Sequence, residues 1–417
     1  MDTSFLGPVL PLREQAPLRN AWLRQRLDTL LPELMERAGL DMWLVVAREY
    51  NEDPVIMTLL PEPEMAARRR TILVFSRRPD GSVERLTVSR YALGGLYDAV
   101  WNPDDEEQDV CLRRVVHARN PRRIGVNVSR TFAFADGLSH QEHERLVAAL
   151  GPELSVRMVS AEPLAIGWLE RRTAEELARY PQLVAMGHRL IARAFSRAVI
   201  RPGETTTDDV IWWMRQTLHD HGLRPWFQPN CEIQAPGQRY DAAEKRVIIQ
   251  PGDLLWCDVG FSYLGLCTDQ QQHAYVLRDG EADAPAGLRA ALAAGNRLQD
   301  LLLAEMRVGR TGNEVLRASR ERAIAEGITP SIYTHPLGYH GHAAGPTIGL
   351  WDRQGGVAGN GDYPLYDSTV YSIELNAVSA VPEWDGQPVR IALEEDAALV
   401  GNRMSWLDGR QEALHLI

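Results

Sequence analysis

Acidic side chains recur in stretches of this sequence where apolar side chains are expected. Asp258 and Asp269 lie in DLLWCDVGFSYLGLCTDQQQHAYVL (253–277), where two apolar runs flank a turn around Tyr263 and Gly265 and predict a β-hairpin. Aspartate is a poor strand former and is rarely buried without a partner. Two aspartates in paired strands therefore indicate a bound cation.

Two more strand-like runs add further carboxylates. Glu374 lies in YSIELNAV (371–378), and Glu394 and Glu395 lie in RIALEEDAALV (390–400). An unpaired cluster of such acids would have to take up protons, whereas two metal ions bridged by carboxylates would neutralise its charge. The pattern therefore favours a dinuclear metal site over unrelated surface acids.

The stretch THPLGYHGHAAGP (334–346) places three histidines among glycines and prolines. Imidazole is a common metal ligand, but a single histidine in a glycine-rich loop is usually only a loop residue. Residue types alone leave open which of His335, His340 and His342 takes part.

The elements that must position these residues form two expected domains, because 417 residues exceed the usual size of one compact core. A helical pattern over 21–40 precedes strand-like runs in an α/β domain with a mixed sheet. The expected strands cover residues 42–47, 71–76, 84–89, 123–128 and 156–160. We place the domain boundary between residues 168 and 169. A long helix follows through 183–199, and Pro181 should kink or restart it.

Composition and charge exclude several classes of protein. The chain is 45% hydrophobic and 24% charged, which is ordinary for a globular enzyme. The net charge of -11 and the absence of a Lys/Arg-rich run argue against nucleic-acid binding. The longest apolar runs are strand-sized, so no membrane insertion is expected. The start of the sequence lacks a signal-peptide pattern and the four cysteines lack CxxC spacing, which favours a reducing cytoplasm.

The order and spacing of the acids and the histidine resemble the pita-bread metallopeptidases, which include methionine aminopeptidases, Xaa-Pro aminopeptidases, prolidases and creatinase. Five family positions are matched: Asp258 in DVG, Asp269 eleven residues later, His335 in HPLG, Glu374 in SIEL and Glu395 in EEDAALV. The resemblance implies a C-terminal α+β pita-bread catalytic domain over 169–417. Residues 1–168 resemble the α/β N-terminal domain of the creatinase and prolidase type.

The resemblance also assigns roles. Asp269 and Glu395 would bridge two divalent ions, Asp258 would bind one, and His335 with Glu374 would hold the other. Glu394 should then point to the opposite face, because side chains alternate along a strand.

Two of the remaining assignments concern catalysis. By the same resemblance, His342 would hydrogen-bond substrate or intermediate without binding metal, and Glu374 would carry the proton to the leaving amine. His340 fits neither role. An oxygen-rich shell with one imidazole suits Mn²⁺ first, and also Co²⁺, Fe²⁺ or Zn²⁺.

The chain also departs from the family pattern. Proline-specific members usually carry one histidine upstream of the PGD turn and another four residues before the metal histidine, where this chain has Tyr240 and Ser331. The residues after Asp269 are QQQH in place of the usual Thr or Ser and Arg. Among these residues, Gln271 can still donate a hydrogen bond to a ligand carboxylate.

The predicted function is a metal-dependent exopeptidase that acts on dipeptides or short peptides, similar to Xaa-Pro aminopeptidases and dipeptidases, and the resemblance implies a homodimer. A metal-dependent hydrolase of a non-proline peptide or another small amide is the alternative. Metal-free chemistry of the creatinase type is disfavoured because all five ligand types are present. A catalytically silent binding protein is the third reading, and it lacks the degraded ligands and charged extensions that would favour it.

Overall fold

The computed structural model describes residues 3–241 and 246–417, and the chain forms two compact units. One unit spans Leu10–Thr173, and the other joins Ala174–Ile417 to the described residues before Leu10. The division therefore falls five residues after the boundary expected from the sequence, at residues 168 and 169.

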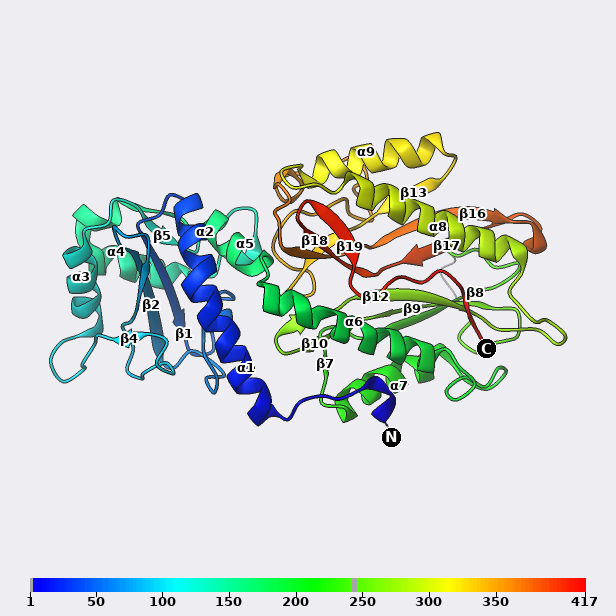
Figure 1. The fold of residues 1–417 in the computed structure, drawn as a ribbon, viewed down its shortest axis with the longest axis horizontal. Helices are drawn as coiled ribbons and strands as arrows, with labels where there is room; N and C mark the ends of the chain where they lie inside the picture. Colours follow the sequence, from blue (N-terminus) through cyan, green and yellow to red (C-terminus); the bar gives the residue numbers. More distant parts are fainter. Residues whose placement is uncertain (1–2, 242–245) are drawn as a thin grey trace. The chain divides into compact units, whose positions relative to one another are not determined.

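The first unit is built on a six-stranded mixed sheet of order β4-β3-β2-β1-β5-β6 (Figure 1). The central strand β1 runs antiparallel to β2 and parallel to β5, which confirms the mixed sheet predicted from the sequence. The strands are β1 (Met42–Arg48), β2 (Arg70–Arg77), β3 (Val83–Thr87), β4 (Asp98–Ala99), β5 (Ile124–Val126) and β6 (Met158–Ser160).

Helices pack on this sheet through alternate residues of β1. Met42, Leu44 and Val46 face one way and share a buried core with Leu112 and Leu146 of two helices. The helices of the unit are α1 (Leu12–Gln25), a π-helical turn (Arg26–Leu30), α2 (Leu31–Arg37), α3 (Gln108–Arg119), α4 (His140–Ser155) and α5 (Glu162–Glu170), with 3-10 turns at Ile56–Thr58 and Ala133–Ala135.

The second unit begins with two helices, α6 (Ala174–Ala194) and α7 (Thr207–Asp220). One helix runs through Pro181, so the restart expected there does not occur. Tyr180 and Leu183 are buried on either side and hold both halves in the same packed helix. The capping box that opens α7 uses Thr206 and Asp209.

The described residues before Leu10 attach to these two helices. Arg189 donates from Nη2 and Nε to the carbonyl oxygen of Leu6, at 2.6 and 3.0 Å. His221, which follows α7, contacts Thr3 Oγ1 at 2.8 Å and the carbonyl oxygen of Gly7 at 2.6 Å. This first segment, which contains the short 3-10 turn Ser4–Leu6, is therefore a structural part of the second unit.

The remainder of the second unit is a set of curved sheets, antiparallel except for the parallel pair of β12 and β20, backed by two more helices (Figure 1). The sheets are β20-β12-β9-β8, β13-β16-β17, β14-β15-β18-β19 and the small β11-β10-β7. Their strands are β7 (Arg224–Pro225), β8 (Asn230–Gln234), β9 (Leu254–Val259), β10 (Phe261–Tyr263), β11 (Leu266–Cys267), β12 (Gln270–Tyr275), β13 (Thr329–Ile332), β14 (His335–Leu337), β15 (Thr369–Ser372), β16 (Leu375–Val381), β17 (Gln387–Leu393), β18 (Asp396–Val400), β19 (Arg403–Trp406) and β20 (His415–Leu416).

The hairpin predicted around Asp258 and Asp269 is confirmed. Strands β9 and β12 pair antiparallel with Asp258 opposite Gln271, and Asp269 directly precedes β12. Helices α8 (Ala286–Glu305) and α9 (Gly312–Ala325) cover the sheets, and 3-10 turns lie at Asn360–Asp362 and Pro382–Trp384. Helix α8 lies close to β17, since a Cβ on Gly295 would meet Leu393 Cδ1 at 3.0 Å.

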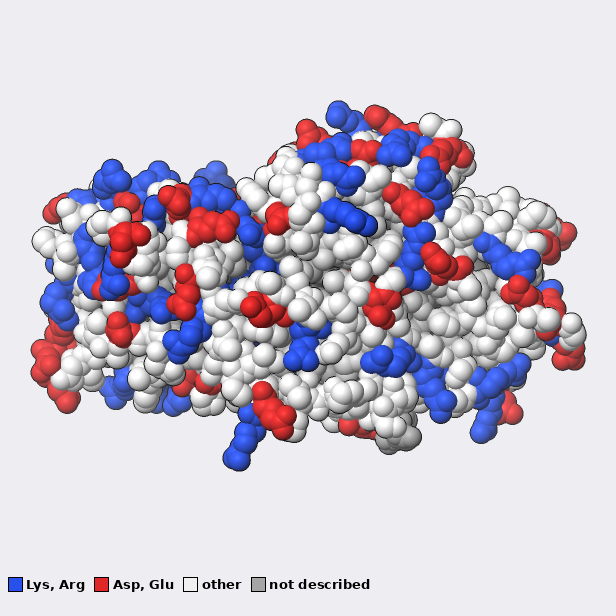
Figure 2. All heavy atoms as spheres, viewed as in Figure 1, with Lys and Arg blue, Asp and Glu red and all other residues white. Residues whose placement is uncertain are grey.

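The surface carries charges of both signs. Figure 2 shows Lys and Arg interspersed with Asp and Glu on the visible face of each unit. Among residues 3–241 and 246–417, no helix combines the length and the apolar character needed to cross a bilayer.

Leu298 of α8 tests the packing of the second unit, because it is fully buried in the core that α8 shares with the sheets. Leu298→Ala should lower the free energy of unfolding by about 2–5 kcal/mol, since it removes buried methyl groups and leaves a cavity. Denaturant unfolding measures the loss. Leu303→Ala, at a partly buried position of the same helix, is the matched control and should cost clearly less. Equal losses would show that α8 does not pack in this register.

Candidate metal centre

Six side chains from separate segments of the chain converge in the second unit. They form three overlapping groups in which the ligand atoms lie within 4.8 Å of one another. The groups are Asp269, His335 and His342; His335, Glu374 and Glu394; and Asp258, Asp269 and Glu394. His335 Nε2 lies 3.4 Å from Glu394 Oε1 and 3.7 Å from Asp269 Oδ2.

The strand topology explains this convergence. Asp258 lies near the end of β9, Asp269 just before β12 and His335 at the start of β14. Glu374 lies between β15 and β16, and Glu394 between β17 and β18. The chain leaves one sheet and enters the next at these last two points, so both carboxylates lie where sheets meet.

The backbone supports this junction between sheets. The Gln271 N–H donates to the carbonyl of Glu394 at 2.9 Å, and the Glu394 N–H donates back to Gln271 at 3.2 Å. The Thr334 hydroxyl and the Tyr333 N–H both donate to the carbonyl of Glu374, at 3.0 and 3.1 Å.

Several atoms of the cluster are buried without a hydrogen-bond partner among the described residues. They are Asp258 Oδ1, Asp269 Oδ1 and His335 Nε2. A buried polar atom without a partner costs free energy, and such atoms are rare in folded proteins. Two anionic oxygens and an imidazole nitrogen that converge in this way fit a bound divalent cation.

Burial raises the pKa of three acids well above its ordinary value. Asp258, Asp269 and Glu374 lose hydration, and the charge of Glu394 raises the pKa of each one further. Without a cation these carboxyl groups therefore hold protons. A divalent ion would compensate the same charge and allow them to ionise.

The two adjacent glutamates lie in different surroundings. Glu394, which was expected to point away from the cluster, belongs to two of the three groups, and Glu395 belongs to none of them. Glu394 Oε2 accepts a hydrogen bond from Gln271 Nε2 at 2.6 Å, and Oε1 accepts one from the hydroxyl of Ser372. Two adjacent glutamates fit the same sequence pattern, so the choice between them as metal ligand stays a prediction, and this geometry favours Glu394.

Glu395 lies on the rear face of the sheet and is fully buried. Its Oε2 lies 2.7 Å from His188 Nε2, and its Oε1 accepts from Gln272 Nε2 at 2.7 Å and from the Gln411 N–H at 3.0 Å. Burial disfavours the charged form of His188, but the hydrogen bonds and charges of Glu395 and Asp408 outweigh it and raise its pKa to about 9. Glu395 thus has its own cationic partner.

Gln271 holds two acids of the cluster in place. Its Nε2 donates to Glu374 Oε1 at 3.0 Å as well as to Glu394, which confirms the predicted hydrogen bond to a ligand carboxylate. Its Oε1 accepts from Trp256 Nε1 at 3.0 Å, which fixes the orientation of the amide. A glutamine can therefore orient two carboxylates at the position where the family usually has a hydroxyl residue.

Aromatic rings surround His342 at the edge of the cluster. The His342 ring centroid lies 4.7 Å from that of His335, 5.2 Å from Trp226 and 5.8 Å from Tyr333. Burial of its ring and the nearby His335 lower the pKa of His342 to about 4, although one edge remains open to solvent. Gly341 allows this contact, since a Cβ there would meet the Trp226 ring at 2.2 Å.

The other predicted positions lie as follows. His340 belongs to none of the three groups found among the described residues. Ser331 lies in β13 opposite Asn376, and Tyr240 is partly exposed. Sequence reasoning missed His188, Ser372 and Tyr333. Tyr333, two residues before His335, and Ser372, two residues before Glu374, carried a signal by their positions, and His188 carried none.

Comparisons with known proteins bear on the family and the fold of this chain. The profile of metallopeptidase family M24 matches residues 183–400. Among curated proteins, none matches this sequence significantly.

Solved structures show the same fold over the whole chain. The X-Pro aminopeptidase of Thermotoga maritima is 16% identical with a TM-score of 0.65, covering 92% of this chain and 99% of its own. The dipeptidase PepE of Mycobacterium ulcerans is 19% identical with a TM-score of 0.63, covering 95% and 98%. The prolidase of Pyrococcus horikoshii is 12% identical with a TM-score of 0.60, covering 93% and 99%.

The two adjacent glutamates can be told apart by metal content. Glu394→Gln should bind fewer than two ions per chain at saturating Mn²⁺, because the amide removes a shared anionic ligand. Glu395→Gln should still bind two, because its carboxylate lies on the rear face. Elemental analysis of the desalted proteins gives the count, and loss of metal only in the Glu395 variant would restore the original assignment.

The metal-free protein should lose stability as pH rises. Asp258, Asp269 and Glu374 have raised pKa values in the folded state, so it retains protons that the unfolded chain releases. Stability is then fully present below the ordinary carboxyl pKa and is lost as pH rises toward the raised values. The Tm in chelator should fall between about pH 5 and pH 8, more steeply than the Tm of Mn²⁺-loaded protein. Parallel curves would contradict the cluster.

Proposed function

The chain belongs to metallopeptidase family M24, and on that premise we propose that it hydrolyses dipeptides or other short peptides with a water activated by two divalent ions. The observation that carries this proposal is the convergence of four carboxylates and one imidazole around buried atoms that lack hydrogen-bond partners. Such a set needs cations and supplies the ligands for them.

The three groups suggest how two ions would be held. Asp269, His335 and Glu394 each belong to two groups. Of these, only the two carboxylates have two oxygens to offer to two ions, which supports a bridging role for Asp269 and Glu394. Asp258 would then complete one site, and His335 with Glu374 the other. None of the groups contains a cysteine, so hard and borderline ions are favoured: Mn²⁺ first, then Co²⁺, Fe²⁺ or Zn²⁺.

The side chains supply the remaining chemistry. Two bound ions would lower the pKa of a shared water and polarise the scissile carbonyl. Glu374 keeps 23% of its side chain exposed, against 1% for Glu394, so it is the better placed to take a proton from water and pass it to the leaving amine. The His342 imidazole lies at the open edge and can donate a hydrogen bond to the carbonyl oxygen as negative charge develops there.

Preference for proline is a separate question. Ser331 and Tyr240 stand where proline-specific members usually have histidines. This departure favours, as a second candidate, hydrolysis of a non-proline peptide or another small amide by the same centre. The homodimer implied by the resemblance stays a prediction that light scattering tests.

The decisive assay uses protein stripped with chelator and reloaded with Mn²⁺ or Co²⁺. It should hydrolyse members of a panel of dipeptides and tripeptides, with and without proline, and the stripped protein should not. Cleavage only before proline would assign Xaa-Pro specificity without the usual histidines. Cleavage of other peptides would assign the second candidate. No hydrolysis of any peptide with the metal fully loaded would contradict the peptidase proposal.

A matched pair of variants links turnover to the centre. Asp269→Asn should reduce kcat by about 100-fold or more, because one bridging carboxylate is lost and each 1.4 kcal/mol of transition-state stabilisation is a factor of ten. Asp279→Asn, the same change at an exposed position after β12, should leave kcat unchanged. Equal activity of the two variants would remove the metal centre from the mechanism.

A further inference from the structure

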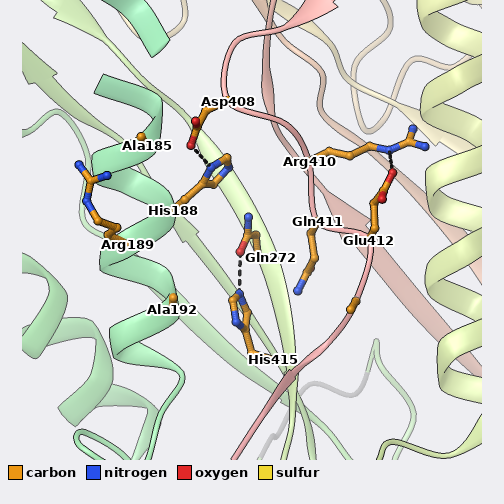
Figure 3. A pocket seen from close by; sticks show the side chains of 11 residues that line it. Ala185, His188, Arg189, Ala192, Gln272, Asp408, Arg410, Gln411, Glu412 and His415 are labelled. Atoms are coloured by element: carbon orange, nitrogen blue, oxygen red, sulfur yellow. Dashed lines mark hydrogen bonds and ion pairs between the residues drawn. The ribbon is translucent and has the colours of Figure 1, made fainter. Parts of the chain in front are cut away.

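A chain of charged side chains lies behind the metal centre, on the rear face of the same sheet. Figure 3 shows His188 of α6 directed at Asp408, 2.9 Å from Nδ1 to Oδ2. The other ring nitrogen lies 2.7 Å from Glu395 Oε2. The order is therefore a partly exposed aspartate, a histidine and a fully buried glutamate.

Glu395 depends on this histidine. Its carboxylate is completely buried and also accepts hydrogen bonds from Gln272 and from the backbone of Gln411, but these two donors are neutral. The ring of His188, 2.7 Å away, is the cationic group in contact with Glu395. A buried carboxylate that loses its charged partner becomes strongly unfavourable.

The rear face and the metal face are connected through adjacent residues. Gln271 bonds Glu394 toward the metal centre, and Gln272 bonds Glu395 toward the rear. Gln271 and Glu394 are also joined by backbone hydrogen bonds in both directions. A shift of this segment by one residue would exchange the two glutamates, because neighbouring side chains point to opposite faces.

We propose that His188, held by Asp408, locks Glu395 on the rear face and thereby determines that Glu394 is the glutamate presented to the metal ions. His188 is a positioning residue. This inference rests on the proposed metal centre, but not on the identity of the substrate. It also gives a role to the second glutamate of the EED sequence, which the ligand set leaves unused.

His188 and Glu395 affect the metal centre through the position of the chain rather than through net charge. A protonated histidine and an ionised glutamate together contribute no net charge to the centre. Replacing both side chains therefore leaves the attraction of the centre for cations nearly unchanged, whereas replacing His188 alone leaves the buried Glu395 without its ring partner and loosens the segment. This difference gives the test its power.

His188 can be altered without filling the metal site. It lines a cavity of about 490 Å³ that opens on the rear face, together with Gln272, Asp408, Gln411 and His415 (Figure 3). His415 offers a matched control, since its Nε2 contacts Gln272 Oε1 at 2.8 Å, whereas the ring of His188 contacts Glu395 itself. The two histidines share one cavity and differ in the contact under test.

The test is a titration of the chelator-stripped full-length protein with Co²⁺, followed by the visible absorption of the bound ion, which reports affinity and ligand geometry without any substrate. His188→Gln should weaken Co²⁺ binding about 10- to 100-fold and change the spectrum, as losses of residues that support metal ligands do. Asp408→Asn should have a smaller effect, because it loosens only the outer end of the chain. His415→Gln should bind as the unaltered protein does.

The double variant His188→Gln/Glu395→Gln decides between the explanations. It should recover Co²⁺ affinity and spectrum, because neither buried charge remains. If it stays as weak as His188→Gln, or if His188→Gln binds Co²⁺ normally, the proposal is wrong. If His188→Gln fails to fold, the double variant and Asp408→Asn still test the proposal. A double variant that folds and binds Co²⁺ normally supports the proposal. A double variant that folds but binds Co²⁺ weakly overturns it.

These outcomes are distinguishable from a failure of the proposed function. If the unaltered protein bound Co²⁺ but cleaved no peptide, the peptidase proposal would fail while the positioning proposal could still be tested. If the unaltered protein bound no Co²⁺, both would fail together.

Discussion

Four carboxylates and one imidazole meet in a part of the fold from which most water is excluded, and bringing like charges together without water costs more than the surrounding hydrogen bonds return. The cluster must hold either protons or metal ions. Much of the surrounding architecture serves this requirement: Gln271 spans two of the acids, Ser372 supports a third, and the strand ends bring side chains from five separate segments to one place.

Glu395 and His188 meet the same requirement in a different way. Glu395 has no place among the metal-site groups, yet it is as deeply buried as its neighbour Glu394. An imidazolium from α6 compensates it. Two consecutive glutamates are thus accommodated in one strand junction by cations of different kinds on opposite faces, and each face constrains the orientation of the other.

The sequence predicted the elements and the type of chemistry better than it predicted which of two adjacent side chains faces the cluster. Aspartates in apolar runs correctly indicated the β9 and β12 hairpin, because acids are costly in strands unless they are paired. Glu394 and Glu395 could not be told apart, because both faces of the junction are buried and alternation gives only opposite faces. What decides is His188, 207 positions away from Glu395, and a lone histidine in an amphipathic helix carries no signal of such a contact. Likewise, the sequence around Pro181 did not show that packing would keep α6 continuous.

The attachment of the first segment to α6 and α7 has a consequence for biosynthesis. Leu6 and Gly7 leave the ribosome early, but their partners Arg189 and His221 follow only after the whole of the intervening unit. At ordinary rates of translation, about 180 residues take roughly 10–40 s. The intervening unit can fold during that interval, while the first segment stays unpaired until the second unit emerges. Completion of the unit that carries the candidate metal centre is therefore a late event, which pairs α6 and α7 with a segment made before the intervening unit.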